Sequence, residues 1–92
     1  MTVEDMRRVL SIYRRRWAGN EIPQWRMVGD EKPASPKLKY AHGHWMLDQI
    51  EGFLEDGRME KAFRWLGFVQ GMLWSEGVYT LDELMEHNRP RK

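Results

Sequence analysis

The sequence contains no cysteine. A disulfide framework, a thiolate metal site and a cysteine nucleophile are therefore excluded, and a reducing compartment suits the chain. No stretch approaches the roughly 18 uninterrupted apolar residues that suggest a membrane-spanning helix. The N-terminus is acidic and then arginine-rich, and it lacks the apolar run of a signal peptide. We therefore expect a soluble, cytoplasmic protein that makes no contact with a membrane.

The chain also has almost no net charge, because 15 basic side chains face 14 acidic ones. A balance of +1 predicts no particular partner. The charges are unevenly distributed, however, with a basic excess over residues 1–17 and an acidic excess over residues 37–57. We expect solvated helix faces of opposite charge that complement each other.

Motifs for catalysis are missing as well. The serines have no nucleophile elbow or base motif around them, and no glycine-rich phosphate loop is present. Two groups of carboxylates have the three- and four-residue spacing of a solvated helix face, at 48–55 and 82–86. The sequence thus predicts neither an enzyme nor a cofactor.

Large aromatic side chains are plentiful, with five Trp, three Tyr and three Phe among 92 residues. A chain of this length forms one domain, and each aromatic side chain buries about 150–250 Å². Small domains bury only about 60% of their unfolded surface. Some of these aromatics are therefore expected to lie in an oligomer interface or a ligand pocket.

Apolar residues recur at helical spacing in most of the chain, as in the stripe Met6, Leu10, Tyr13 and Trp17. Helix caps are predicted at Thr2, at Ser35-Pro36 and at Thr80. The prediction is an all-α fold, a small four-helix domain with three main helices and a short C-terminal one. Its parts are helices at 3–18, 36–56, 58–76 and 81–87, a long ordered loop at 19–35 pinned by Trp25, and a tail at 88–92.

The helix at 58–76 is the most apolar and is expected to be the central packing element, buried on several sides. Gly67 and Gly71 share one face and would let another helix approach closely. Together with the uncovered aromatics, they predict a homodimer.

Arg64 and Gln70 interrupt this apolar helix, and burying such groups is costly unless they are paired. One interpretation is that Arg64 extends to solvent or meets a carboxylate from the helix at 36–56. The other is that these positions belong to a site for an anionic or aromatic partner. The candidate binding residues are Arg64, Gln70, His42, Trp45, Lys39 and Trp25.

Two further kinds of site are considered. His42 and His44 are two residues apart and do not share a helix face, so His44 and Asp48 alone would be too few for a metal site, and none is predicted. Nucleic acid could contact the first helix, with Trp17 and Trp25 as stacking platforms. Against this stand the near-zero net charge and the lack of a recognition-helix pattern. The possible phosphate contacts are Arg7, Arg8, Arg14 and Arg15.

The octet Arg-Trp-Leu-Gly-Phe-Val-Gln-Gly at residues 64–71 resembles a group of small tailed-phage and prophage proteins that share an R-W-L-G-F-V/I-Q-G tract. An upstream His and Trp-Met match His42 and Trp45-Met46, and the end of the chain from Asp82 to Pro90 is similar too. The likeness covers residues 37–90 and supplies no catalytic residues.

This resemblance implies a phage or prophage source and action in the host bacterial cytoplasm. It leads to the hypothesis of a non-enzymatic accessory protein for host takeover or counter-defence, anti-CRISPR-like or otherwise, that binds and blocks a host protein. Two alternatives stay open. The protein could sequester a nucleotide-type defence signal through Arg64, His42 and Lys39, or it could bind nucleic acid through its arginine-rich first helix.

Overall fold

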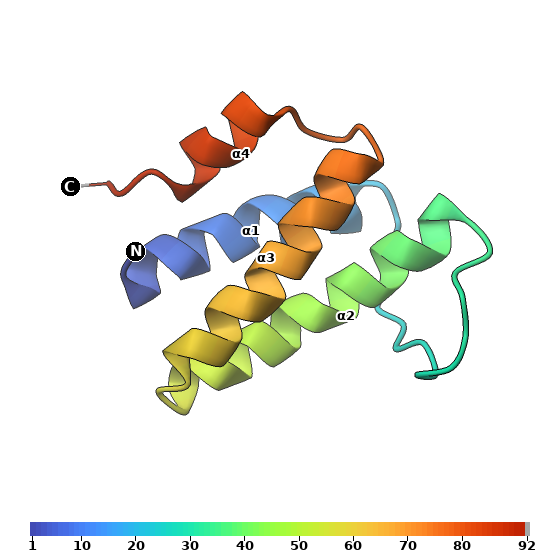
Figure 1. Cartoon of the computed structure of the whole chain (residues 1–92), viewed down its shortest axis with the longest axis horizontal. Coiled ribbons are helices and arrows are strands. Elements are labelled where there is room, and N and C mark those ends of the chain that lie inside the picture. The colour runs from blue at the N-terminus through green and yellow to red at the C-terminus, as the bar shows by residue number, and fades with distance from the viewer. Residues whose placement is uncertain (92) are drawn as a thin grey trace.

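A computed structural model describes residues 1–91 of the chain. It contains four helices, α1 (Val3–Gly19), α2 (Pro36–Glu55), α3 (Met59–Ser75) and α4 (Leu81–Asn88) (Figure 1). No strand occurs in that described part. The prediction of a small all-α domain with a long loop after the first helix is confirmed, and the observed helix ends lie within one residue of the predicted ones.

Local capping explains where these helices begin. The hydroxyl of Thr2 accepts the Asp5 backbone N–H at 3.0 Å, while the Asp5 carboxylate accepts the Thr2 N–H. Thr80 and Glu83 make the same reciprocal pair at the start of α4. These capping boxes satisfy N–H groups that a helix leaves unpaired in its first turn.

Glycines in the left-handed conformation end α2 and α3. Gly57 has φ 74° and Gly77 has φ 71°, a region that glycine enters without steric cost. The residue after each glycine donates its N–H back to the last turn, as from Arg58 to the Phe53 carbonyl at 2.8 Å. This arrangement is a Schellman motif, and it turns the chain sharply from α2 into α3.

The helix α2 has neighbours on two sides, because it packs against both α1 and α3. The short α4 returns to pack on α1 and α3, away from α2 (Figure 1). The predicted stripe on α1 is fully inside this arrangement. The core also contains Leu47 and Ile50 from α2 and Leu66, Val69 and Leu73 from α3.

The expectation that α3 is buried on several sides is wrong. Its buried residues form one stripe, whereas Phe63, Phe68 and Trp74 on the opposite side are 41%, 62% and 51% exposed. The physical reason is the number of available neighbours, since only α2 and the short α4 pack against α3. We call the surface of Phe63, Arg64, Gly67, Phe68, Gly71 and Trp74 the outer face of α3.

One helix-interior glycine has a clear packing role. A methyl group at Gly43 would lie 2.8 Å from the ring of Trp17 and 2.6 Å from the end of Met72. The absence of a side chain therefore lets the Trp17 ring lie across α2. Gly52, by contrast, has no atom within 4 Å of the corresponding position, and nothing in the structure explains it.

None of the helices in residues 1–91 combines the length and the apolar character needed to cross a membrane.

Candidate binding cleft

Two histidines on α2 hold the long loop against the helix. The ring Nδ1 of His44 donates to the Ile22 carbonyl at 2.8 Å, and the ring Nδ1 of His42 accepts the Met27 N–H at 3.1 Å. A carbonyl can only accept and an N–H can only donate, so the two rings carry their protons on different nitrogens. The pair therefore fixes both ends of the segment 22–27.

The indole of Trp25 does not pin this loop as predicted. Its side chain is 62% exposed, and only its backbone N–H is used, donating to the Ala41 carbonyl at 3.0 Å. A further contact comes from the Gln24 amide, which donates to the Asp48 carboxylate at 3.0 Å. Backbone and polar contacts, rather than an aromatic anchor, hold the loop.

The bond from Met27 sets the state of His42. Because Nδ1 accepts, the proton of the neutral ring lies on Nε2. Burial lowers the pKa of His42, and the positive charge of Arg26 lowers it further, so the neutral form is favoured. The Nε2–H makes no hydrogen bond within residues 1–91 and is available as a donor.

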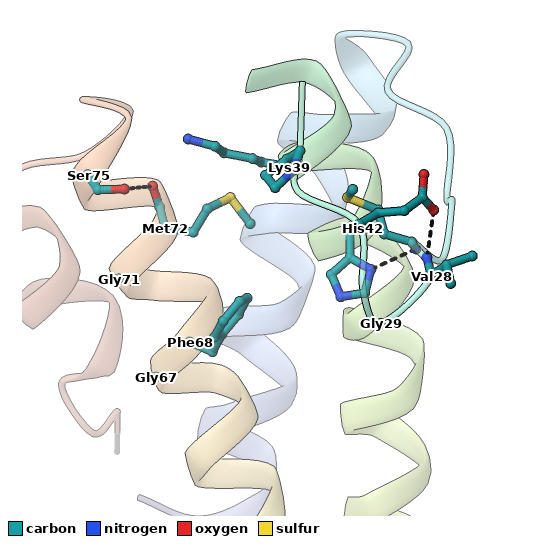
Figure 2. Close-up of a pocket in the computed structure, with 12 residues that line it drawn as sticks. Val28, Gly29, Lys39, His42, Gly67, Phe68, Gly71, Met72 and Ser75 are labelled. Atoms are coloured by element: carbon teal, nitrogen blue, oxygen red, sulfur yellow. Dashed lines mark hydrogen bonds between the residues drawn. The ribbon is translucent and has the colours of Figure 1, made fainter. Parts of the chain in front are cut away.

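A cleft of about 670 Å³ lies between this loop, the first turns of α2 and the outer face of α3. Figure 2 shows Phe68 and Met72 on its α3 side, with His42 and Val28 on the other. The volume falls in the range of about 300–1,000 Å³ that is usual for ligand sites. The lining residues are Met27, Val28, Gly29, Glu31, Pro33, Lys39, His42, Gly67, Phe68, Gly71, Met72 and Ser75.

The α3 side of the cleft is open down to the backbone. A methyl group at Gly67 or Gly71 would meet no atom within 4 Å. No other helix in residues 1–91 thus packs closely against α3 at these two glycines. A bound group could instead contact the α3 backbone directly, beside the exposed ring of Phe68.

The ionic groups at the rim are already partnered within the chain. The ammonium of Lys39 forms a salt bridge with Glu76, which directly follows α3. The Glu31 carboxylate accepts the Val28 N–H at 3.1 Å. The cleft therefore presents an apolar surface with one uncommitted, neutral hydrogen-bond donor, that of His42.

A smaller hollow of about 390 Å³ adjoins the cleft and shares His42 and Phe68 with it. Arg64 lines this hollow together with Met46 and Trp65. Its guanidinium lies 3.7 Å from Glu60 one turn earlier on α3, and both side chains are exposed. The predicted pairing with a carboxylate from α2 is not found, and an exposed pair of this kind adds about 0–1 kcal/mol.

An aromatic row leads away from His42 across α2 and α3. The ring centroids of His42 and Trp45 are 5.3 Å apart, those of Trp45 and Trp65 are 6.1 Å apart, and Trp65 meets Phe53 edge-on at 4.9 Å. These separations fit favourable ring packing. We call His42, Trp45, Trp65 and Phe53 the aromatic row.

Three cations cover the rings of this row. Arg26 lies 5.4 Å from the Trp45 centroid, Lys61 lies 4.8 Å from that of Phe53, and Arg58 lies 5.5 Å from the same ring. Within residues 1–91 none of the three is in a salt bridge. The row, which begins at the cleft residue His42, therefore carries three positive charges along its length.

Of the predicted binding residues, the structure brings His42 and Lys39 into the cleft and Arg64 and Trp45 next to it. Trp25 lies on the loop outside the lining.

Gln70 points to the other side of α3, away from the cleft. Its amide donates to the Tyr13 hydroxyl at 3.0 Å and exchanges two hydrogen bonds with Asn88, at 2.7 and 3.1 Å. Tyr13 in turn bonds to the ring Nδ1 of His87 at 2.9 Å. Gln70 therefore belongs to a partly buried polar cluster between α1, α3 and α4, and its place in the sequence is explained by packing.

Met27, Phe68 and Met72 are among the cleft residues that were not singled out from the sequence. A signal existed for the first, because an apolar residue in a proline-rich loop needs a surface to cover it. Phe68 and Met72 lie in a helix that is apolar nearly all round, where the pattern does not show which side is left open.

Three of the four predicted phosphate contacts on α1 are engaged by other parts of the chain, and the fourth, Arg15, is exposed. Arg7 pairs with Glu51 at 2.8 Å and Arg14 with Asp48 at 2.9 Å, both across to α2. Arg8 bonds to the Asp5 carboxylate and to two carbonyls at the end of α4. The predicted complementarity of basic and acidic helix faces is confirmed.

The two residues considered as metal ligands, His44 and Asp48, are also bonded to other residues of the chain. The His44 ring is used by Ile22, and Asp48 is used by Arg14 and Gln24. Residues 1–91 hold no group of three or more side chains with metal-ligating chemistry.

A scan of protein-family models, a search of curated proteins and a search of solved structures find no match to this chain. The likeness to small phage proteins therefore stays a prediction.

Proposed function

We propose that this chain is a non-enzymatic binding protein that uses the outer face of α3 and the adjoining cleft to capture a host protein. In keeping with the phage resemblance, its role would be host takeover or counter-defence in the bacterial cytoplasm.

The observation that carries the proposal is the exposure of large aromatic side chains on α3. Phe63, Phe68 and Trp74 all lie outside the buried stripe of α3 and are 41%, 62% and 51% exposed. Single exposed apolar residues are ordinary, but three large exposed aromatics on one helix are typical of protein interfaces, where aromatic residues are enriched. Aromatic anchors also supply a large share of the binding energy in such interfaces.

The character of the cleft supports the same function. Its walls are mainly apolar, and its rim ions Lys39 and Glu31 are bonded within the chain. The hydroxyl of Ser75 in the lining donates to the Met72 carbonyl rather than to a base, and Glu31 is the only carboxylate among the lining residues. Apolar walls and a single free donor favour recognition of a partner's side chain.

A nucleotide-type signal is the second candidate, supported by His42 and by Arg64 in the adjoining hollow. It is less favoured because Lys39, the cation inside the cleft, is bound to Glu76. Nucleic acid on α1 is less favoured still, since Arg7, Arg8 and Arg14 are already paired.

We also propose a homodimer that uses the outer face of α3. The open space above Gly67 and Gly71 would let two α3 helices cross closely. A second copy and a host protein would then exclude each other, because both need the exposed ring of Phe68.

The test is native mass spectrometry of the protein recovered from lysate of its bacterial host. We expect a stoichiometric complex with one host protein, retained in Met85→Ser and lost in Phe68→Ser. Met85 is a matched control, because it is 66% exposed but lies on α4 outside the cleft. A complex that survives Phe68→Ser, or a retained nucleotide mass in place of a protein, would overturn the proposal.

A further inference from the structure

We infer that the partner presents a short acidic segment with one aromatic anchor, whose ring enters the cleft over Gly67 and Gly71 while its neighbouring carboxylates lie along the aromatic row. This inference rests on the proposed function and names the chemistry of the surface that the protein would recognise.

The cleft suits an aromatic guest better than an aliphatic one. Two thioethers, Met27 and Met72, line it together with the ring of Phe68. Sulfur and ring edges interact favourably with a further aromatic ring. The bare backbone at Gly67 and Gly71 leaves room for a flat group to lie against α3.

The same guest should carry no negative charge and should have a hydrogen-bond acceptor. Lys39 is paired with Glu76, and the Glu31 carboxylate keeps its negative charge, so an anionic group inside the cleft would find no free counter-ion there. A buried charge without a partner is unfavourable. The Nε2–H of His42 is free to donate to a carbonyl of the anchoring residue.

Negative charge is favoured next to the cleft rather than inside it. Arg26, Arg58 and Lys61 border the aromatic row and form no salt bridge within residues 1–91. Arg64 adds a fourth cation, held only by an exposed contact with Glu60. Acidic side chains beside the anchor would complement these cations and speed association.

A protein segment fits this border better than single-stranded nucleic acid. Nucleic acid needs ring faces on which its bases can stack. Here Arg26 covers the Trp45 ring, and Lys61 lies over both Phe53 and Trp65. Carboxylates need only the cations, and Arg26 and Lys61 form no salt bridge within residues 1–91.

The experiment titrates the purified full chain with synthetic peptides and follows the methyl resonances of Met27 and Met72. The probe is acetyl-Glu-Glu-Trp-Glu-Glu-amide, compared with a peptide that has Leu at the centre and with one that has Lys in place of each Glu. We expect saturable shifts with a dissociation constant on the order of 1 mM or below. The peptide with the central Leu should bind about fivefold more weakly than the probe. The peptide with Lys in place of each Glu should lose at least as much affinity.

Matched variants separate the two parts of the site. Gly71→Leu fills the cleft and should abolish the shifts, whereas Gly52→Leu, also at a helical glycine with open space around it, should leave them unchanged. Arg26→Gln with Lys61→Gln should weaken binding and reduce its salt dependence. Arg15→Gln, an exposed cation on α1, should not.

Equal binding of the acidic and basic peptides, no saturable shift, or full binding by Gly71→Leu would overturn the inference. So would displacement of the peptide by oligothymidylate or by ATP at equal concentration, which would point to a nucleic-acid or nucleotide site. If the peptides fail while Phe68→Ser still removes a host-protein complex, the proposed function stands and only this partner chemistry is wrong.

Discussion

The hydroxyl of Tyr13 joins α1, α3 and α4 through side chains alone. It bonds to the His87 ring at 2.9 Å and to the Gln70 amide at 3.0 Å. Burial raises the pKa of Tyr13 to about 12, so the group stays protonated as the donor to His87. Tyr13→Phe should lower the free energy of unfolding by about 1–3 kcal/mol, because it leaves buried polar groups unpaired. Urea denaturation measures this change.

Tyr79→Phe is the control for that substitution. The ring centroid of Tyr79 lies 5.8 Å from that of Tyr13, but the Tyr79 hydroxyl makes no hydrogen bond within residues 1–91. Its loss should change the unfolding free energy by less than about 0.5 kcal/mol. Equal effects of the two substitutions would contradict the assigned role of the cluster.

Two histidines make stability depend on pH. Burial lowers the pKa of His42 and of His87 below the usual 6.5, because the protonated form is poorly solvated there. Below that value the unfolded chain binds more protons than the folded one, so stability falls as the pH falls. The pKa values of Asp5 and Glu83 are lowered too, chiefly by N–H groups at the helix caps, and both stay ionised near neutrality.

We therefore expect a smaller unfolding free energy at pH 5.5 than at pH 7.5. The loss should shrink in His87→Asn, which keeps a polar side chain but does not titrate. Urea denaturation at the two pH values tests this, and an unchanged pH dependence in the variant would show that His87 is not responsible.

At the scale of elements, the crossing of α1 over α2 depends on one missing side chain. Gly43→Ala would place a methyl group 2.8 Å from the ring of Trp17, a residue that is only 2% exposed. The contact with Met72 is less serious, because a flexible thioether can move aside. We expect a loss of about 1–3 kcal/mol of unfolding free energy, typical of an overpacked core.

Gly52→Ala on the same helix should have the opposite sign. No atom lies within 4 Å of the added methyl group, so only the helix propensity changes. A gain of up to about 1 kcal/mol is expected in the same denaturation assay. If Gly43→Ala and Gly52→Ala both destabilise the protein, then α2 is sensitive to substitution in general and not specifically at the Trp17 contact.

The helices could be predicted because their signals are local. Caps such as Thr80 with Glu83 and the stripe that contains Tyr13 lie within a few residues of sequence, and they fix where a helix begins and which side is apolar. The exposure of Phe68 could not be predicted in this way. It depends on how many other helices are available to cover α3, which is a property of the whole chain.

The candidate site was predictable only in part, for the same reason. His42 and Lys39 were selected as groups that could contact an anionic partner, and they do line the cleft. Gln70 was selected because it interrupts an apolar helix, yet its partners Tyr13 and Asn88 are 57 and 18 residues away. Contacts at such separations leave no periodic trace in the sequence.

At the scale of the whole molecule, the proposed dimer gives a direct prediction. Sedimentation equilibrium should show a dimer at concentrations on the order of tens of micromolar. Trp74→Ser, which removes a half-exposed aromatic from the outer face of α3, should shift the protein toward the monomer. Leu81→Ser removes a comparably exposed side chain from α4 and should not. A wild-type monomer under these conditions would contradict the dimer.

The central claim is that the outer face of α3 contacts another protein inside the bacterial cell. The most direct measurement replaces Phe68 with a photo-crosslinking benzoylphenylalanine, irradiates living host cells and compares the adducts with those formed from Met85, which is equally exposed on α4. We predict one discrete host-protein adduct from position 68 and none from position 85. No adduct from position 68, or the same adduct from both positions, would contradict the account.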